Sequence, residues 1–298
     1  MFVSAIAISG GMIGCARTVA TIDVPPPPRV LTNPTPTIEE LATAINRTDA
    51  IQQLSTNSAR LDVRSMAAIP KLSATMHLRR ERSFRLRASL PIVMGAGLDM
   101  GSNDSEFWFE VPEGVTQTLY YANHQTYASN LNRAVLPVDP SWLMQAIGLP
   151  RLDPASVLAG PVLRGDGMIE VRTAEPTAAG TFQRVMLVEP SAGYVTHLFL
   201  YDPNQRLVAK SVASKHQFYD TVNVVLPHAV DVALYPAAGP PMEMSLEISN
   251  YSINQLLTDD PGLFVLPATP RRIDLTTLTA AAPATAYRDS GSIGTRLR

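Results

Sequence analysis

Two neighbouring stretches of the chain place an apolar residue at every second position, and this period of two limits what the chain can fold into. The stretches are Lys71–Arg80 and Ser83–Leu90, and Glu106–Val111 continues the pattern with Trp108 on its polar side. A strand with this period has one apolar and one polar face, and sheets of such strands are typically antiparallel. We therefore predict an antiparallel meander within Leu61–Tyr127, with one dry face and one face lined by arginine and hydroxyl groups.

Two short helices accompany the predicted strands. Thr37 and Glu40 stand three residues apart before an apolar run, which is a capping box and predicts a helix start. Asp139 followed by Pro140 predicts the start of a second helix, which ends at Gly148. Further strands are predicted at Met168–Arg172, Phe182–Glu189, Tyr194–Tyr201, Arg206–Ser214, Ala229–Tyr235 and Met242–Ile248. Because strands and helices do not alternate, we predict one curved antiparallel sheet of about ten strands with helices on its dry face.

The composition sets broad limits on size and partners. The chain has 298 residues, 46% of them hydrophobic, which is enough for one large β domain with a sizeable core. Its formal net charge is -2, whereas nucleic-acid-binding domains carry a concentrated basic surface. The composition therefore argues against a nucleic-acid partner.

The amino terminus has the features of a secretion signal that ends at a cysteine. Phe2–Ile13 is an apolar run that is too short to span a bilayer, which needs about 20 apolar residues, but that suits a signal peptide. The sequence Met12-Ile13-Gly14-Cys15 resembles a bacterial lipobox, although leucine is commoner in place of Met12 and no Lys or Arg precedes the run. The resemblance implies that Cys15 becomes the first mature residue and carries acyl chains that anchor the protein in a membrane.

Two alternatives remain for this terminus: an ordinary signal peptide, or a buried N-terminal strand with an incidental cysteine. Cys15 is the only cysteine in the sequence, so internal disulfides and sites built on several cysteines are excluded. Ala16, which follows it, is neutral in the lipoprotein sorting rule of Gram-negative bacteria and favours the outer membrane.

The predicted domain organisation has four parts. Residues 1–15 are the lipoprotein signal peptide ending at the lipidated cysteine, and residues 16–36, with the run Pro25–Pro28, are a proline-rich tether. Residues 37–266 are the folded domain. Residues 267–298 are rich in Ala, Thr, Arg and Pro without periodicity, so we predict a disordered tail there.

The layout of the folded part resembles the LolA/LolB superfamily of lipoprotein-handling proteins. The resemblance rests on an N-terminal helix, a meander up to Phe84-Arg85-Leu86-Arg87, a middle helix at Trp142, and a closing pair of strands followed by Asn250 and Phe264. The segment from Asp99 to Phe109 is similar to LolB-like lipoproteins of planctomycete-type bacteria. The resemblance covers nearly the whole of the folded part.

This resemblance implies a mainly β (α+β) fold, in which a half-barrel sheet covers two or more helices and the hydrophobic space between them holds acyl chains. Acyl-chain binding needs concave apolar surface and little polar specificity. The residues that we place in this space lie on dry strand faces or on the middle helix: Met76, Phe84, Leu86, Phe107, Phe109, Trp142 and Met144. The alternative is that these residues simply pack the helices onto the sheet, because dry strand faces usually form core.

The sequence contains no motif of a familiar catalytic site. It has no G-x-S-x-G elbow, no H-E-x-x-H helix and no G-K-[ST] phosphate loop. Asp99, Asp104 and Glu106 fit a solvated turn better than a calcium loop, because the EF-hand spacing is absent. We therefore predict no catalytic residue, no metal and no cofactor.

Together these features predict a lipid-anchored cell-envelope lipoprotein on the periplasmic face of the outer membrane. Its half-barrel would hold acyl chains, for lipoprotein reception and localisation or for lipid sensing, without catalysis. Its partners would be the membrane, through the N-terminal lipid, and the acyl chains of lipoproteins or lipids. The alternative is an envelope scaffold or interaction lipoprotein with the same fold, a filled core and no ligand.

Overall fold

The structure is a computed structural model, and it describes residues 26–66, 69–90, 97–113, 116–129, 138–178, 180–237 and 240–278. The predicted signal peptide, the lipidation site Cys15 and the first part of the tether lie outside the described residues, as do residues 279–298.

Within these ranges, 15 strands form one large sheet, and β12 and β13 form a separate pair. The spatial order is β17-β6-β5-β4-β3-β2-β1-β15-β14-β11-β10-β9-β8-β7, and β16 also pairs with β1. Neighbouring strands run antiparallel, except that β17 pairs in parallel with β6. The strands are β1 (Gln53–Asp62), β2 (Leu72–Arg79), β3 (Ser83–Ser89), β4 (Gly97–Ser102), β5 (Glu106–Glu113), β6 (Thr116–Asn123), β7 (Val157–Leu163), β8 (Ile169–Thr177), β9 (Gly180–Val188), β10 (Val195–Tyr201), β11 (Leu207–Ser214), β12 (Gln217–Tyr219), β13 (Val224–Leu226), β14 (Ala229–Leu234), β15 (Met242–Ile248), β16 (Ser252–Ile253) and β17 (Arg271–Asp274).

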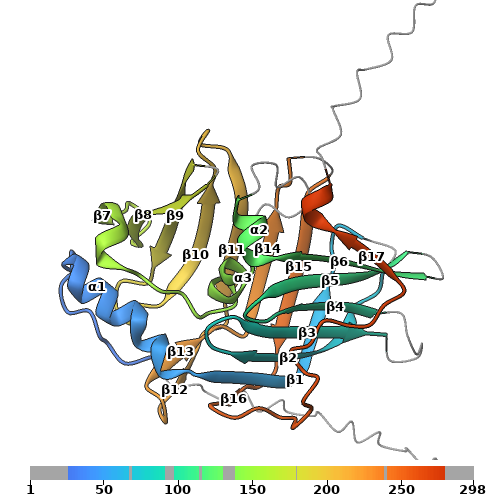
Figure 1. Cartoon of the computed structure of the whole chain (residues 1–298). Helices are drawn as coiled ribbons and strands as arrows, with labels where there is room; N and C mark the ends of the chain where they lie inside the picture. Colours follow the sequence, from blue (N-terminus) through green and yellow to red (C-terminus); the bar gives the residue numbers. More distant parts are fainter. Residues whose placement is uncertain are drawn as a thin grey trace, which may run out of the picture.

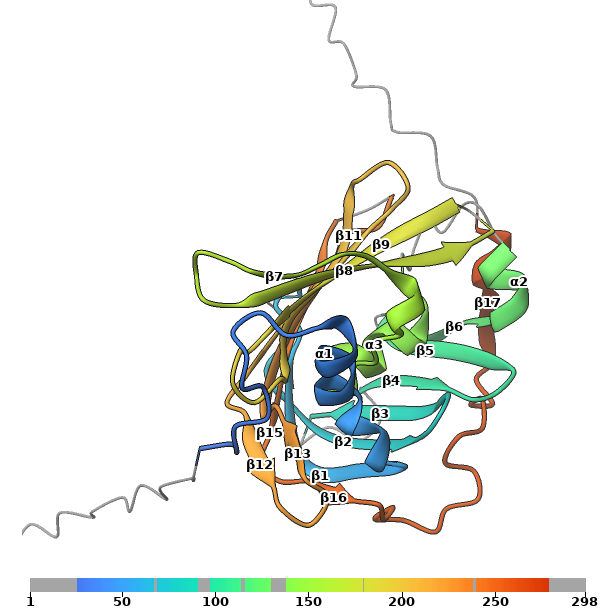
Figure 2. The same cartoon turned by 90° about the vertical axis from the view of Figure 1, so that its left-hand side faces the viewer.

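The helices are few and short. The described ranges contain the α-helices α1 (Ile38–Ile45), α2 (His124–Ser129) and α3 (Pro140–Ala146), and the 3-10 helices η1 (Asn46–Ala50), η2 (Pro154–Ser156) and η3 (Leu275–Thr277). Figure 1 shows the strands of the sheet side by side, and Figure 2 shows the sheet curling around α1 and α3. None of the described helices is long and hydrophobic enough to cross a bilayer.

Both predicted helix starts are confirmed. The Glu40 N–H donates to Thr37 Oγ1 (3.2 Å) and the Thr37 N–H donates to Glu40 Oε2 (2.8 Å), which completes the capping box of α1. Asp139 Oδ1 accepts a hydrogen bond from the Ser141 N–H (2.9 Å) at the start of α3. The turn after α3 contains Gly148 with a φ of 113°, a conformation that favours glycine. Local capping chemistry therefore sets where these helices begin.

The sheet is antiparallel and curved, as predicted, but it has more than ten strands. The missed strands lack a long alternating pattern: β12, β13 and β16 have two or three residues each, and β7 contains Gly160 and Pro161. β1 begins at Gln53, well before the predicted start at Leu61. The sequence pattern does not reveal this start, because a β-bulge between Thr56 and Ala59 interrupts the alternation. The predicted extension of the meander to Tyr127 is wrong, because that residue belongs to α2.

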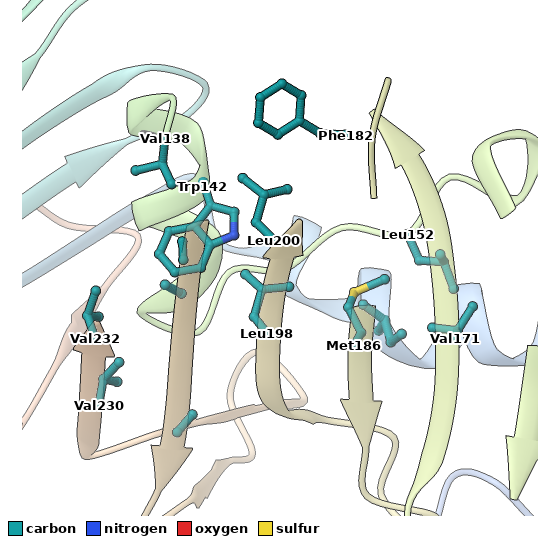
Figure 3. Close-up of a cluster of buried hydrophobic side chains, with 14 of the residues drawn as sticks. Val138, Trp142, Leu152, Val171, Phe182, Met186, Leu198, Leu200, Val230 and Val232 are labelled. Carbon is teal, nitrogen blue, oxygen red and sulfur yellow. The ribbon is translucent and has the colours of Figure 1, made fainter. Parts of the chain in front are cut away.

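Two apolar clusters fill most of the space between the sheet and the helices. The first joins α1 and α3 to the inner face of β8–β11 and β14, and Trp142 of α3 lies there with Leu198 and Leu200 of β10 (Figure 3). The second lies on the inner face of β1–β3 and β15 and includes Met144 of α3. Neighbouring side chains of α3 therefore pack against different halves of the sheet.

Part of the outer face of the meander is covered, which corrects the prediction of a solvated polar face around Arg85, whereas Arg87 and Ser89 are exposed as predicted. Residues 254–270 run along the outside of the meander to β17 (Figure 2). Arg85 Nη1 donates hydrogen bonds to the carbonyl oxygens of Leu263 (3.2 Å) and Val265 (2.9 Å) in this segment. As a result Arg85 is only 3% exposed and Trp108 only 2%. Backbone carbonyls replace water around the guanidinium, so Arg85 lies in the interior although the sequence pattern predicts that it faces solvent.

The folded part extends beyond the predicted boundaries at residues 37 and 267. Arg271–Asp274 form β17, and Leu275 is buried, so the predicted disordered tail begins too early. At the other end, the N–H groups of Val30 and Leu31 both donate to the carbonyl oxygen of Ser191 (2.8 and 2.9 Å), within the predicted tether. Both contacts join residues far apart in the chain, which composition alone does not reveal.

Candidate functional site

A cavity of about 300 Å³ lies between the inner face of the meander, α3, and the strands β14 and β15. This volume is at the lower end of the range of about 300–1,000 Å³ that small-molecule sites occupy. Its lining is almost entirely apolar. The larger apolar residues that line it are Val63, Met66, Ile69, Leu72, Phe84, Leu90, Leu98, Met100, Phe107, Phe109, Leu143, Leu234, Met242 and Met244, together with Trp108, whose indole lies on the outer face beside Arg85.

Strand register brings the sheet side of this lining together. Met100 of β4 lies opposite Leu86 of β3 and Phe109 of β5, so these three side chains share one face. The alternation of β15 puts Met242 and Met244 on the same inner face, opposite inward-facing residues of β14. The cavity therefore lies where the meander meets the strands from the end of the chain.

The helix α3 closes another side of the cavity. Pro140 and Leu143 are three residues apart, so they share a face of the helix, and both line the cavity. Trp142 and Met144 instead pack into the two apolar clusters. Leu143 is only partly buried, since the space in front of it is not filled by other side chains.

Of the seven residues that the sequence places at the ligand site, three line the cavity and four do not. Phe84, Phe107 and Phe109 line the cavity. Met76, Leu86, Trp142 and Met144 are not part of the lining and have exposed fractions of 0%, 3%, 2% and 7%. These four side chains pack as core, as the alternative interpretation of the sequence predicts. A ligand contact for the three phenylalanines stays a prediction.

Most of the lining is not distinguished by the sequence pattern. Met242 and Met244 alternate with polar residues, and Met100 and Leu98 do so over a shorter stretch. This pattern indicates an inner face but not which part of that face is left open. That depends on which side chains of α3 cover each strand, and those contacts join distant parts of the chain.

The cavity offers little polar chemistry. Among the described residues that line it, Glu243 is the one ionisable group and Ser65 the one hydroxyl, and both residues are largely exposed. No histidine lines it: His77 bonds to Ser55 Oγ (3.1 Å) and His228 Nε2 to the Tyr219 hydroxyl (2.9 Å). Nowhere in the described ranges do three His, Cys, Asp or Glu side chains gather as a metal site requires.

A buried ionic cluster joins α3 to the opposite half of the sheet. Arg184 of β9 contacts Glu175 Oε1 (2.9 Å) and donates to Gln145 Oε1 of α3 (2.5 Å) and to Thr173 Oγ1 (3.2 Å). Burial lowers the pKa of the Arg184 guanidinium and raises the pKa of the Glu175 carboxyl. Because each buried charge here has a partner, the cluster holds the side of α3 that faces away from the cavity.

Comparison with known proteins gives matches in structure only. No protein-family model matches the sequence, and no curated protein matches it. One similar structure is a domain named for outer-membrane lipoprotein sorting from Vibrio parahaemolyticus, with 9% identity, a TM-score of 0.48, and coverage of 76% of this chain and 97% of that chain. A DUF1329 family protein from Desulfovibrio piger has 14% identity, a TM-score of 0.46, and coverage of 76% and 96%.

A LolA superfamily protein from Nitrosomonas europaea has 11% identity, a TM-score of 0.38, and coverage of 72% of this chain and 94% of that chain. All three likenesses have TM-scores below 0.5. At such identities and TM-scores they describe the general course of the chain and say nothing about a ligand.

Proposed function

We propose that this protein is a lipid-anchored cell-envelope lipoprotein whose cavity holds an acyl chain, without catalysing a reaction. The observation that carries the proposal is the 300 Å³ cavity with its nearly unbroken apolar lining. Side chains such as Leu98, Leu143 and Met244 are partly buried there, so a hydrocarbon chain would remove further apolar surface from water. Each Å² of apolar surface buried contributes about 25 cal/mol.

The chemistry of the lining favours a flexible apolar chain over a polar ligand. A polar or ionic ligand needs buried donors and acceptors, and the described lining supplies one hydroxyl and one carboxylate, both largely exposed. Methionine side chains are unbranched and adaptable, so they suit chains of different length and saturation. The acyl groups of lipoproteins or of membrane lipids share this chemistry, for reception of a lipoprotein or for sensing of lipid.

Membrane attachment through Cys15 is the second part of the proposal. The lipobox-like sequence before this residue supports it, and the proposed location is the periplasmic face of the outer membrane. Mass spectrometry of the mature protein is the test. A diacylglyceryl group on an N-terminal Cys15 is expected, and an unmodified thiol would contradict the anchor without affecting the cavity.

The alternative function is an envelope scaffold with a filled core. The burial of Met76, Leu86, Trp142 and Met144 favours it, because buried side chains of this kind usually form core. The cavity beside Leu143 favours chain binding. The two functions differ in one measurable property, which is whether the purified protein holds a hydrocarbon chain.

Binding of a fluorescent fatty acid to the purified protein tests this difference, together with lipid extraction and native mass spectrometry. Leu143→Trp should place a larger side chain in the cavity and weaken binding. Leu158→Trp is the matched control, because Leu158 is 56% exposed on β7 and does not line the cavity. If the unchanged protein takes up no fatty acid and yields no lipid, the scaffold is the better description.

A further inference from the structure

Four of the residues that line the cavity are methionines, and all four are more exposed than the buried methionines of the two apolar clusters; Met168 is partly exposed too but does not line the cavity. These cavity methionines are Met66, Met100, Met242 and Met244. Met66 is 48% exposed and the other three are partly exposed. By contrast, Met76 and Met186 lie in the two clusters with no exposed surface. The chain thus contains an accessible set and a buried set of the same side chain.

Accessible thioethers react with two-electron oxidants. A hypohalous acid transfers its oxygen to the sulfur, R–S–CH3 + HOCl → R–S(O)–CH3 + H+ + Cl−, so that sulfur loses two electrons and chlorine gains them. The product is a polar sulfoxide in place of a flexible apolar group. The reaction needs no other group from the protein.

We propose that oxidation of the cavity methionines by a hypohalous acid switches the cavity from chain-binding to non-binding. This inference rests on the proposed function, since it concerns the affinity for an acyl chain. A sulfoxide oxygen accepts hydrogen bonds, and the described lining offers the Ser65 hydroxyl as its one side-chain donor, while Glu243 only accepts when ionised. A bound chain would leave the new oxygens without a partner, which is unfavourable.

Position within the cavity makes the effect large. Met100 lies on β4 opposite Phe109, and Met242 and Met244 lie on β15, which β3, β2 and β1 separate from β4 in the sheet. Oxidation therefore introduces polar groups at separate parts of the lining, not at a single point of it.

The test treats the full protein with increasing hypochlorous acid and measures two quantities. Peptide mass spectrometry gives the sulfoxide content at each methionine, and fluorescence titration gives the dissociation constant of a fluorescent fatty acid. We expect the cavity methionines to oxidise at lower doses than Met76 and Met186. We expect the dissociation constant to rise by about tenfold or more as they do, because the sulfoxides must be desolvated to bind a chain.

A variant with all four cavity methionines changed to leucine is the control. Leucine is similar in volume and cannot be oxidised in this way, so whatever the affinity of the untreated variant, its dissociation constant should not rise on treatment. The double variant Met242→Leu, Met244→Leu gives the same comparison with fewer changes to folding, and should lose less affinity on treatment than the unchanged protein.

The outcomes separate the two proposals. Failure of the untreated protein to bind fatty acid counts against the proposed function. Unchanged affinity with all four sulfoxides formed overturns the inference alone, and so does oxidation of Met76 and Met186 at the same dose. Equal loss of binding in the leucine variant on treatment also overturns it, because another group would then be the target.

Discussion

The two halves of the sheet, β7–β11 and β1–β6, differ in which of their faces is packed. In the first half the inner face is filled, with Trp142 packed among Leu198 and Leu200, and the outer face carries exposed ion pairs such as Arg172–Glu170 (2.7 Å). In the second half the inner face contains the cavity, and residues 254–270 cover the outer face around Arg85. The comparison indicates that the meander can leave apolar surface open inside because the cover supplies burial outside.

The largest expected effect comes from comparing two adjacent residues of α3, Trp142 in the filled core and Leu143 at the cavity. Trp142→Ala should lower the free energy of unfolding by about 3–5 kcal/mol, because the indole is 2% exposed and its removal leaves a void. Leu143→Ala should cost only about 1 kcal/mol, since that side chain already faces the cavity. Urea unfolding of both variants measures the difference, and equal losses would contradict the division between a filled and an open half.

The cover over the meander is tested by Arg85→Ala. Removing the guanidinium leaves the carbonyl oxygens of Leu263 and Val265 and the carboxylate of Asp99 without their buried partner, which should cost about 2–4 kcal/mol. Arg172→Ala on the exposed outer face of the other half should cost less than about 1 kcal/mol. Limited proteolysis should also cut near Leu263 faster in the Arg85 variant, and an unchanged rate would show that the cover does not depend on this arginine.

A glycine in the meander gives the next largest effect. A Cβ at Gly101 would lie inside van der Waals contact of the Trp108 indole, which stacks beneath Arg85 (5.1 Å from the guanidinium carbon to the ring centre). Gly101→Ala should therefore cost about 1–3 kcal/mol as the indole is displaced. Gly165→Ala, where no atom lies within 4 Å, should change stability by less than about 1 kcal/mol. Thermal unfolding gives the melting temperatures of the two variants. Equal decreases in melting temperature would contradict a clash between the new methyl group and the Trp108 indole.

The smallest effect is a pH dependence that differs between the halves. Burial lowers the pKa of His216, which stacks on Tyr194 beside the filled half (4.1 Å between ring centres), from 6.5 to about 4. The unfolded chain binds a proton in this interval and the folded chain does not, so stability should fall as the pH drops from about 6.5 toward 4. The loss should be on the order of 1–2 kcal/mol, smaller than a full conversion of the shift because the ring is partly exposed.

Substitution at two histidines locates this dependence. His216→Gln should remove much of the slope of unfolding free energy against pH. His77→Gln, on the outer face of the meander, should remove less, although burial and then the charge of Arg87 also lower the pKa of His77. Urea unfolding at several pH values provides the measurement. If the pH dependence of the unfolding free energy persists in the His216 variant, other titratable groups cause it.

The sequence predicts those parts of the fold that depend on neighbouring residues. The capping box at Thr37 and the Asp139 cap are local, and the alternation in β2 and β3 needs only the chain around it. Arg85 shows the limit of this reasoning, because its position alternates with apolar residues and so indicates a solvent-facing side chain. Residues 254–270, which cover it, have no periodicity to indicate where they pack.

The candidate site shows the same limit. Met76 and Met100 both lie on inner strand faces, although the sequence predicts a strand and a ligand contact only for Met76. Met76 has no exposed surface and shares a cluster with Met144 of α3, whereas Met100 is partly exposed and lines the cavity. Which of two equivalent positions is filled depends on where α3 crosses the sheet, and α3 is held there by Gln145 and Arg184.

The place of β1 has a consequence for how the polypeptide is made. Ala59 of β1 lies opposite Ala74 of β2 on one side and Ile248 of β15 on the other. The first strand to be synthesised therefore cannot complete its pairing until β15, one of the last strands, has been synthesised. Until Met242–Ile248 arrives, one flank of β1 offers unpaired backbone groups beside an apolar face, which is a template for association with other chains. Premature termination before Met242 should therefore yield aggregates and not a smaller stable domain.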